Sequence, residues 1–455
     1  MKTENFSRRN FLKLTGSAGL LTALGQFNLA EAAGFQDYKA LVCIFLFGGN
    51  DGHNTVIPMS ASDYPAYANA RGGLALSGNK LLPVTTTNGR QFALNYGMVE
   101  LQQMFQQGKL AVVANTGLLN QPTTKLQYQQ NAVPLPTQLF SHSDQVVQMQ
   151  AGVPTSSASS GWGGRIADLA QPNNANSTFP ASISMNGSAL FCAGLSVPGT
   201  NLQPGNSLDQ YAMSNGWPQA AINARINAQK QIIALGNSNR LIAAADKVMN
   251  DTWQLNTILK TASGGGNTGF DPTVATSTLG KQLSAIAQLI NVRTQTAVGR
   301  QVFFAGLGGF DTHSGQDYQQ WVLLQEVSKA IKAFYDSTVA MGVSGQVTTF
   351  TLSDFGRSLQ PSGTGSDHGW GSHYLVAGGA VNGQQVYGQF PIFNANDSAY
   401  DPNAFADSRG ILLPTTSLAQ YGATLAKWFG AADSQLNSLF PELANFAVRD
   451  LGFML

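Results

Sequence analysis

The sequence holds five histidines, and each lies within a few residues of an acid, a hydroxyl or a glycine. None of them falls on a long helical stripe, where an imidazole would simply pack in a core. The five short stretches are "GGNDGH" with Asp51 and His53, "FSHSD" with His142, "GGFDTH" with Asp311 and His313, "TLSDFGR" with Asp354 and Arg357, and "SDHGWGSH" with His368 and His373. Together they predict a site that uses carboxylates and imidazoles.

Carboxylate oxygens and neutral imidazole nitrogens together are the ligands of Zn²⁺, Mn²⁺ and similar ions, whereas carboxylates alone favour Mg²⁺ or Ca²⁺. A pair of ions about 3.5–4 Å apart can hold the attacking and leaving oxygens of a phosphoryl transfer. The sequence leaves open which of these divalent ions binds and whether one or two are present. With only Cys43 and Cys192 in the chain, the sequence disfavours a structural zinc cluster.

A hydroxyl next to these acids could act as a nucleophile. "FSHSD" stands at the expected start of a helix, where free backbone amides favour an oxyanion. Ser141 and Ser143 are both candidates, and Ser141, His142 and Arg357 form our predicted catalytic set. The alternatives are a simple helix cap for the serines and an ion pair with a surface acid for Arg357.

The elements that must position these residues are alternating strands and helices. The continuous apolar run at 38–49 is typical of a buried parallel strand, and further strand-forming runs at 110–115, 300–309 and 346–354 alternate with helical stretches. An open α/β sheet gathers the carboxyl ends of parallel strands at one edge, where ligands bind. Asp51, Asp311 and Asp354 each follow such a run. Residues of about 155–295 are helix-rich and predict a helical insertion in one large domain, 33–455.

The composition excludes some classes of partner. Charged residues make up 11% of the chain and the formal net charge is +1, so no basic surface for nucleic acid is expected. Cys43 lies in the apolar run "ALVCIFLF" and is expected to be a small buried side chain. A disulfide between Cys43 and Cys192 is the alternative.

The N-terminus resembles an export signal. Paired arginines in "SRRNFLK" precede a moderately apolar stretch and the small-residue site "AEAA", a pattern that resembles a twin-arginine signal peptide over residues 1–32. The apolar stretch is too short and too rich in Gly and Thr for a stable membrane span. The expectation is therefore a periplasmic or otherwise exported protein that meets the twin-arginine translocase. The alternative is an amphipathic helix of the mature fold.

Several of these stretches, with "GWGGRIADL", "GSDHGWGSHYLVAGGAVNGQQVYG" and "LLPTTSLAQYGATLAKWFG", resemble domain of unknown function family 1501, whose members are similar to the alkaline-phosphatase-like superfamily. The resemblance covers most of the mature chain. It implies a three-layer alkaline-phosphatase-like α/β domain with a mainly parallel sheet. It also implies roles, with Ser141 as the nucleophile and the metal ligands being Asp51, Asp311, His313, Asp354 and His368 or His373.

The chain also departs from the superfamily's pattern. Phe355 stands where a ligand histidine would follow Asp354, which points to a reduced ion set. The formylglycine motif of type I sulfatases is absent from the sequence, which disfavours that route. The function expected is an exported metal-dependent hydrolase or transferase acting on small or polymeric phosphate, phosphonate or sulfate esters. The alternative is a non-catalytic periplasmic binding or export-assisting protein on a degenerate phosphatase-like fold. His53 is expected either to support a metal ligand from the second layer or to contact the substrate.

Overall fold

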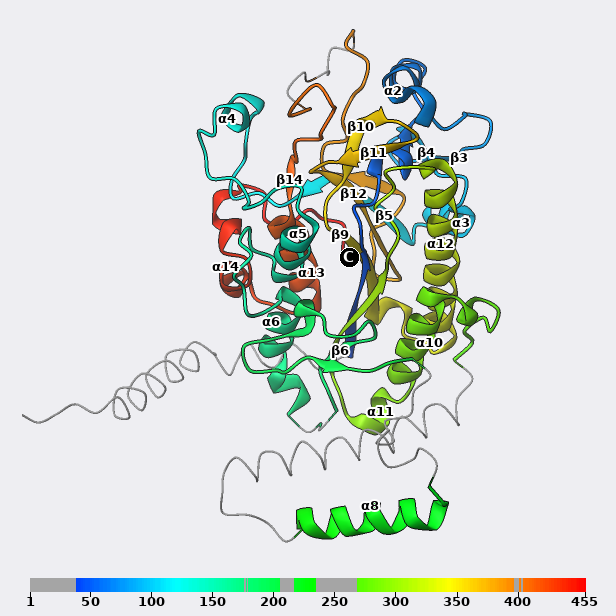
Figure 1. Cartoon of the computed structure of the whole chain (residues 1–455), viewed down its shortest axis with the longest axis vertical. Helices are drawn as coiled ribbons and strands as arrows, with labels where there is room; N and C mark the ends of the chain where they lie inside the picture. The colour runs from blue at the N-terminus through cyan, green and yellow to red at the C-terminus, as the bar shows by residue number, and fades with distance from the viewer. Residues whose placement is uncertain are drawn as a thin grey trace, which may run out of the picture.

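The computed structural model describes residues 38–175, 177, 179–204, 217–234, 268–396, 401 and 404–455. A central sheet of nine strands lies between two layers of helices (Figure 1). The predicted three-layer α/β architecture with a mainly parallel sheet is therefore confirmed. The expected signal peptide, residues 1–32, lies outside the described residues.

The sheet has the strand order β13-β5-β12-β9-β1-β8-β6-β7, with β14 paired to β5. Its strands are β1 (Lys39–Leu46), β5 (Leu110–Gly117), β6 (Ser182–Ser184), β7 (Thr200–Asn201), β8 (Arg300–Leu307), β9 (Val347–Ser353), β12 (Ser372–Gly378), β13 (Gln385–Tyr387) and β14 (Thr416–Ser417). β1 pairs in parallel with both β8 and β9. β12 runs antiparallel to β5 and β9, so its first residues lie at the carboxyl edge of its neighbours.

Both faces of the sheet are buried, which explains the unbroken apolar run of β1. Val42 and Ile44 face one core, and Cys43 and Phe45 face the other. The first core packs against α3 (Val99–Gln106), α10 (Thr278–Asn291) and α12 (Gln316–Ala340). The second packs against α6 (Trp162–Leu169), α13 (Leu418–Phe429) and α14 (Leu436–Leu439). Figure 1 shows the two groups of helices on opposite sides of the sheet.

Residues 155–295 are more than the helical insertion we expected. They supply the strands β6 and β7 at one edge of the central sheet, and β6 pairs in parallel with β8. α6 and α10, from the same stretch, belong to the two helical layers. In the described part of the stretch, the α-helices are α6, α8 (Gln219–Ala234), α10 and α11 (Arg293–Thr296). The prediction weighed its Ala- and Gln-rich helices and missed its short strands.

Smaller elements surround the carboxyl edge of the sheet. β2 (Val56–Pro58), β4 (Gln91–Leu94) and β3 (Leu82–Thr85) form one antiparallel sheet, and β10 (Arg357–Ser362) with β11 (Gly365–His368) forms a hairpin. Within the described residues, the further α-helices are α2 (Asp63–Arg71), α4 (Lys125–Gln129) and α5 (His142–Ala151). Short 3-10 helices are η2 (Gly52–Asn54), η3 (Gly72–Leu74), η4 (Gln171–Asn174), η5 (Leu190–Cys192), η6 (Val274–Thr276), η7 (Ser344–Gln346), η8 (Asp433–Gln435) and η9 (Pro441–Asn445).

Two further expectations concern the cysteines and the membrane. Cys43 and Cys192 are both buried and free, so the disulfide alternative is not met in this structure. Burial raises the pKa of both thiols. Among the described residues, no helix has the length and apolar character that a membrane span requires.

The turn from β9 into β10 depends on a close approach of two backbones at Gly356. A methyl group on Gly356 would lie 2.0 Å from the carbonyl oxygen of Gly371. We predict that Gly356→Ala destabilises the protein by at least about 1–3 kcal/mol, because the two loops must separate. Gly345→Ala is the matched control, since nothing lies within 4 Å of the added methyl group. Urea unfolding of both variants measures the difference, and equal midpoints would contradict the packing argument.

Candidate metal centre

At the carboxyl edge of the sheet, four of the five predicted stretches contribute side chains to one group. Asp311 and His313 lie in the loop after β8, and Asp354 directly follows β9. Arg357 begins β10 and His368 ends β11, where the two residues are paired across the hairpin. His142 is the first residue of α5. Parallel strand ends and a short hairpin therefore bring together side chains that are more than 200 positions apart in the sequence.

The side chains converge on one oxygen atom, Asp311 Oδ1. The Nε2 atoms of His313, His368 and His142 lie 3.0, 3.3 and 3.4 Å from it. His368 Nε2 is also 3.2 Å from His142 Nε2 and 3.0 Å from His313 Nε2. We call His142, His313, His368 and Asp311 the histidine cluster. Two imidazole nitrogens at such a separation require a shared proton or a shared cation between them.

Hydrogen bonds on the far side of two rings fix their orientation. His142 Nδ1 lies 2.7 Å from Asp354 Oδ2, and His368 Nδ1 lies 2.7 Å from the carbonyl oxygen of Phe140. Both partners are acceptors, so each Nδ1 carries a proton, and in the neutral imidazole the Nε2 lone pair then faces the cluster. This arrangement, an imidazole backed by a carboxylate or carbonyl, is the usual setting of a metal-ligating histidine.

The distances fit one four-coordinate ion. Ligand atoms about 2.0–2.1 Å from a tetrahedral ion such as Zn²⁺ are separated from one another by about 3.3 Å. The three mutual distances among His142 Nε2, His368 Nε2 and Asp311 Oδ1 are 3.2, 3.3 and 3.4 Å. In the described part of the chain, these three residues form a group whose ligand atoms are close enough to bind one ion. Two histidines and one carboxylate would leave further coordination positions open.

The charges around the cluster keep its acid ionised. Burial alone would raise the pKa of Asp311, but the Arg357 guanidinium and the neighbouring histidines lower it overall. The pKa of His142 is raised, mainly by its hydrogen bond to Asp354. Burial lowers the pKa of His368, which favours the neutral imidazole that a metal requires.

Asp354 lies behind His142 and is not one of the three residues of this triangle, although the resemblance implies that it is a ligand. Both of its oxygens accept from the backbone N–H of Gly48 at 3.2 Å, and Oδ2 also faces His142. Only 2% of Asp354 is exposed. Phe355 beside it is buried, and its ring lies 4.7 Å from the rings of both His142 and His368. An apolar wall thus replaces the further imidazole that the resemblance implied.

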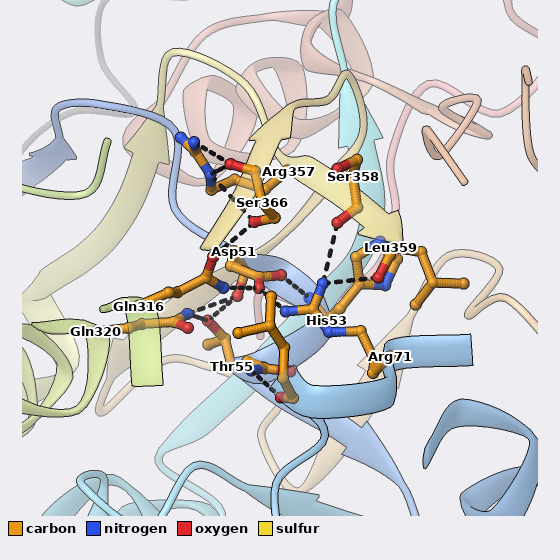
Figure 2. A network of polar contacts seen from close by, with 12 residues as sticks. Asp51, His53, Thr55, Arg71, Gln316, Gln320, Arg357, Ser358, Leu359 and Ser366 are labelled. Atoms are coloured by element: carbon orange, nitrogen blue, oxygen red, sulfur yellow. Dashed lines mark hydrogen bonds and ion pairs between the residues drawn. The ribbon is translucent and has the colours of Figure 1, made fainter. Parts of the chain in front are cut away.

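Asp51 lies in a separate buried network, shown in Figure 2. Its carboxylate is paired with Arg71, accepts a hydrogen bond from the Gln316 amide, and accepts the backbone N–H of His53 at 2.9 Å. Asp51 and the Arg71 side chain are almost fully buried. The strand order correctly placed Asp51 at this edge of the sheet, but its oxygens are already used by protein donors. This removes it from the predicted ligand set.

His373 and His53 also lie outside the histidine cluster, buried beneath aromatic rings. The Phe390 ring stacks on His373 with ring centres 4.6 Å apart, and His53 faces Phe393. His373 Nδ1 accepts the backbone N–H of Asn115 at 3.0 Å. His368, and not His373, is therefore the imidazole that joins the cluster. Burial lowers the pKa of His53 and lowers that of His373 to about 3.

The predicted nucleophile Ser141 is the N-cap of α5, directly before His142. Its hydroxyl donates to Asp144 Oδ2 at 2.6 Å and lies 3.1 Å from the Ser143 hydroxyl. These bonds, with one from Ser156, lower the pKa of Asp144. Ser141 directly precedes His142 in the sequence, but its hydroxyl contacts Ser143 and Asp144 at the helix start.

Sequence reasoning missed several residues that support the site. Asp367 Oδ1 lies 3.4 Å from His313 Nδ1, and "SDHG" was the signal that could have included it. Phe140 contributes only a carbonyl oxygen, which no side-chain pattern reveals. Gln316 and Ser366 lie in the buried network, and Arg71 pairs with Asp51 from 20 residues away. Buried amides and hydroxyls carry no distinctive sequence signal.

Acid should destabilise the fold through His373. Its pKa is about 3 in the folded state and about 6.5 when unfolded. The unfolded chain therefore binds the proton first, so this residue costs nothing above pH 6.5 and destabilises the fold as the pH falls from 6.5 toward 3. The slope approaches about 1.4 kcal/mol per pH unit.

The measurement is urea unfolding from pH 7 to pH 4.5, in chelator. His373→Asn is the test variant, because its amide oxygen can still accept from Asn115 and does not titrate. Its stability should fall less steeply with acid than that of the wild type. Parallel curves for the two proteins would show that His373 does not contribute.

The comparisons with known proteins identify a family. None of the curated proteins matches the chain. The model of a family described as "Protein of unknown function (DUF1501)" matches residues 38–439, which include every strand of the central sheet and all residues of the histidine cluster. The chain therefore belongs to the DUF1501 family.

Proposed function

We propose that this protein is a metal-dependent hydrolase or transferase that acts on phosphate, phosphonate or sulfate esters. The observation that carries the proposal is the triangle of His142 Nε2, His368 Nε2 and Asp311 Oδ1, with sides of 3.2–3.4 Å. Proteins rarely place two imidazole lone pairs and a carboxylate oxygen so close without a cation, because the like-charged or lone-pair atoms repel. A divalent ion removes that repulsion.

His142, Asp311 and His368 would hold one such ion, and Zn²⁺ or Mn²⁺ suits this donor set better than Mg²⁺ or Ca²⁺. When bound, a divalent ion polarises an ester oxygen and lowers the pKa of water, which are the two effects that ester hydrolysis needs. Asp354 and the Phe140 carbonyl keep the two imidazoles aimed at it. His313 stands 3.0 Å from both Asp311 Oδ1 and His368 Nε2, at the exposed side of the cluster.

The other predicted catalytic residues take different parts in this proposal. The Arg357 side chain is fully buried and bonded to protein oxygens, so it holds Asp311 and does not contact the substrate. Ser141, the N-cap of α5, is the proposed nucleophile, with Asp144 as the acceptor of its proton. The free amides of the first turn of α5 would favour a negatively charged ester group.

The superfamily relationship and the export route complete the proposal. A mainly parallel three-layer α/β fold with acids at its carboxyl edge supports a relationship to the alkaline-phosphatase-like proteins. Phe355 fills the position of a further ligand, which supports one ion and not two. "SRRNFLK" and "AEAA" support passage through the twin-arginine translocase as a folded protein.

Metal binding is the first test. We predict that protein purified without a chelating tag contains about one transition-metal ion per chain, and that Asp311→Asn contains none. The bound ion should raise the melting temperature at pH 7.5, because a ligand that binds only the folded state stabilises it. Metal analysis and thermal melts with and without chelator measure both effects.

Asp354→Asn provides a graded comparison, since it removes the charge behind His142 and leaves the three ligands in place. Its metal affinity should fall by about 10–100-fold. Hydrolysis of aryl phosphate, phosphonate and sulfate esters should follow the metal content across these variants. A wild type without metal, melting alike with and without chelator, would instead favour a non-catalytic binding protein on the same fold.

Export gives an independent prediction. Replacing Arg8 and Arg9 by Lys should leave the precursor in the cytoplasm, because the paired arginines are the recognised feature of the signal. The wild-type chain should appear outside the cytoplasm without residues 1–32. Fractionation followed by N-terminal sequencing measures both, and unchanged export of the Lys variant would contradict the assignment.

A further inference from the structure

Arg357 connects the histidine cluster to the protein behind it. Its Nη1 donates to Asp311 Oδ1 at 3.0 Å and to the Gly48 carbonyl at 3.0 Å. Its Nε donates to the Ser366 carbonyl at 3.0 Å. Asp311 is 44% exposed at its side chain and Arg357 is fully buried, so the buried partner sets the position of the exposed one.

A chain of hydrogen bonds continues from Arg357 into the protein, as Figure 2 shows. Arg357 Nε lies 3.3 Å from the Ser366 hydroxyl, which donates to Gln316 Oε1 at 2.6 Å. The Gln316 amide nitrogen donates to Asp51 Oδ2, and Asp51 is paired with Arg71. We call Arg357, Ser366, Gln316 and Asp51 the buried chain. Each of its members is at most 2% exposed.

The charge of Asp51 fixes the direction of the chain. If the Gln316 amide were turned over, its carbonyl oxygen would face the Asp51 carboxylate, and the two would repel. The amide nitrogen must therefore point to Asp51 and the amide oxygen to Ser366. That oxygen in turn takes the hydroxyl proton of Ser366, which leaves the hydroxyl oxygen free to accept from Arg357. Every link depends on the one before it.

We propose that Asp51 and Gln316 are positioning residues for the metal centre, acting through Ser366 and Arg357 on Asp311 Oδ1. The inference rests on the proposed function, since it assigns the buried chain to the same site. Asp311 Oδ1 is both the acceptor of Arg357 and the oxygen that the Nε2 atoms of all three imidazoles approach. Whatever fixes the guanidinium therefore fixes a ligand atom. The acid after the first strand anchors the site and does not bind the ion.

The charges support this assignment. A divalent ion on Asp311 would withdraw electron density from the carboxylate and repel the adjacent guanidinium. Arg357 then depends more on its other hydrogen-bond partners to stay buried, because an uncompensated buried charge is costly. The buried chain links it, through the neutral groups of Ser366 and Gln316, to the ion pair of Asp51 and Arg71.

The helix that supplies Gln316 also supplies a matched control. Gln320 lies one turn later on α12 and is likewise buried. Its amide donates to the backbone carbonyl of Asp51 at 2.8 Å, and its other partners are the side chains of Asn50 and Thr55, not Ser366 or Arg357. Gln316→Leu and Gln320→Leu therefore remove the same amide from the same helix face, and only the first breaks the buried chain.

The experiment titrates tag-free full-length protein, stripped by chelator, with Zn²⁺ in a calorimeter and with Co²⁺ in a spectrophotometer. We expect Gln316→Leu to weaken Zn²⁺ binding by about 10–100-fold, and Gln320→Leu to change it by less than about 3-fold. The visible Co²⁺ spectrum should shift only in Gln316→Leu. Melting temperatures of the stripped variants should fall by similar amounts, which separates positioning from general destabilisation.

The outcomes are distinct. If both variants lose the same affinity, or neither does, while the wild type binds Zn²⁺, the positioning role is wrong and the proposed function stands. A wild type that binds neither ion overturns the proposed function and this inference with it. Should Gln316→Leu fail to fold, Ser366→Ala removes one oxygen from the same chain. That variant must then show the same loss of affinity and the same spectral shift.

Discussion

The site is organised around one carboxylate oxygen. Asp311 Oδ1 lies within 3.0–3.4 Å of three imidazole nitrogens and of the Arg357 guanidinium. Few arrangements satisfy so many groups at once. The loop after β8, the hairpin of β10 and β11, and the start of α5 must each bring a side chain to this oxygen. The open parallel sheet makes that achievable, because it delivers strand ends to a common edge without any special local sequence.

The sheet itself could be predicted from the sequence. Unbroken apolar runs such as that of β1 occur because both faces of the strand are buried, and this pattern is readable without a structure. The short strands β6 and β7 could not be recognised, since two or three residues carry no periodicity. The expectation of a helical insertion at 155–295 therefore did not include these two strands.

The same limit explains how far the site could be foreseen. Asp311, His313 and His368 follow or end predicted strands and do meet. Asp51 also follows a predicted strand, but its carboxylate is paired with the Arg71 guanidinium. The sequence does not show this pairing. Asp354 and His142 were both among the predicted site residues. That Asp354 lies behind His142 could not be predicted, because such a contact depends on side-chain direction. His373 lies apart from His368 because it is buried against the Phe390 ring, which the sequence does not show.

The antiparallel strand β12 has a consequence for how the site can change. Because β12 returns directly beside β9, the chain needs no crossover helix between them. One contiguous stretch of about twenty residues, 354–373, thus carries Asp354, Arg357, Asp367 and His368, and both of its ends are fixed in the sheet. Its contacts with β9 and β12 form over short loops, at low entropic cost. Substitution or exchange of this stretch could therefore alter the chemistry of the edge while the parallel core and its two helical layers keep their packing.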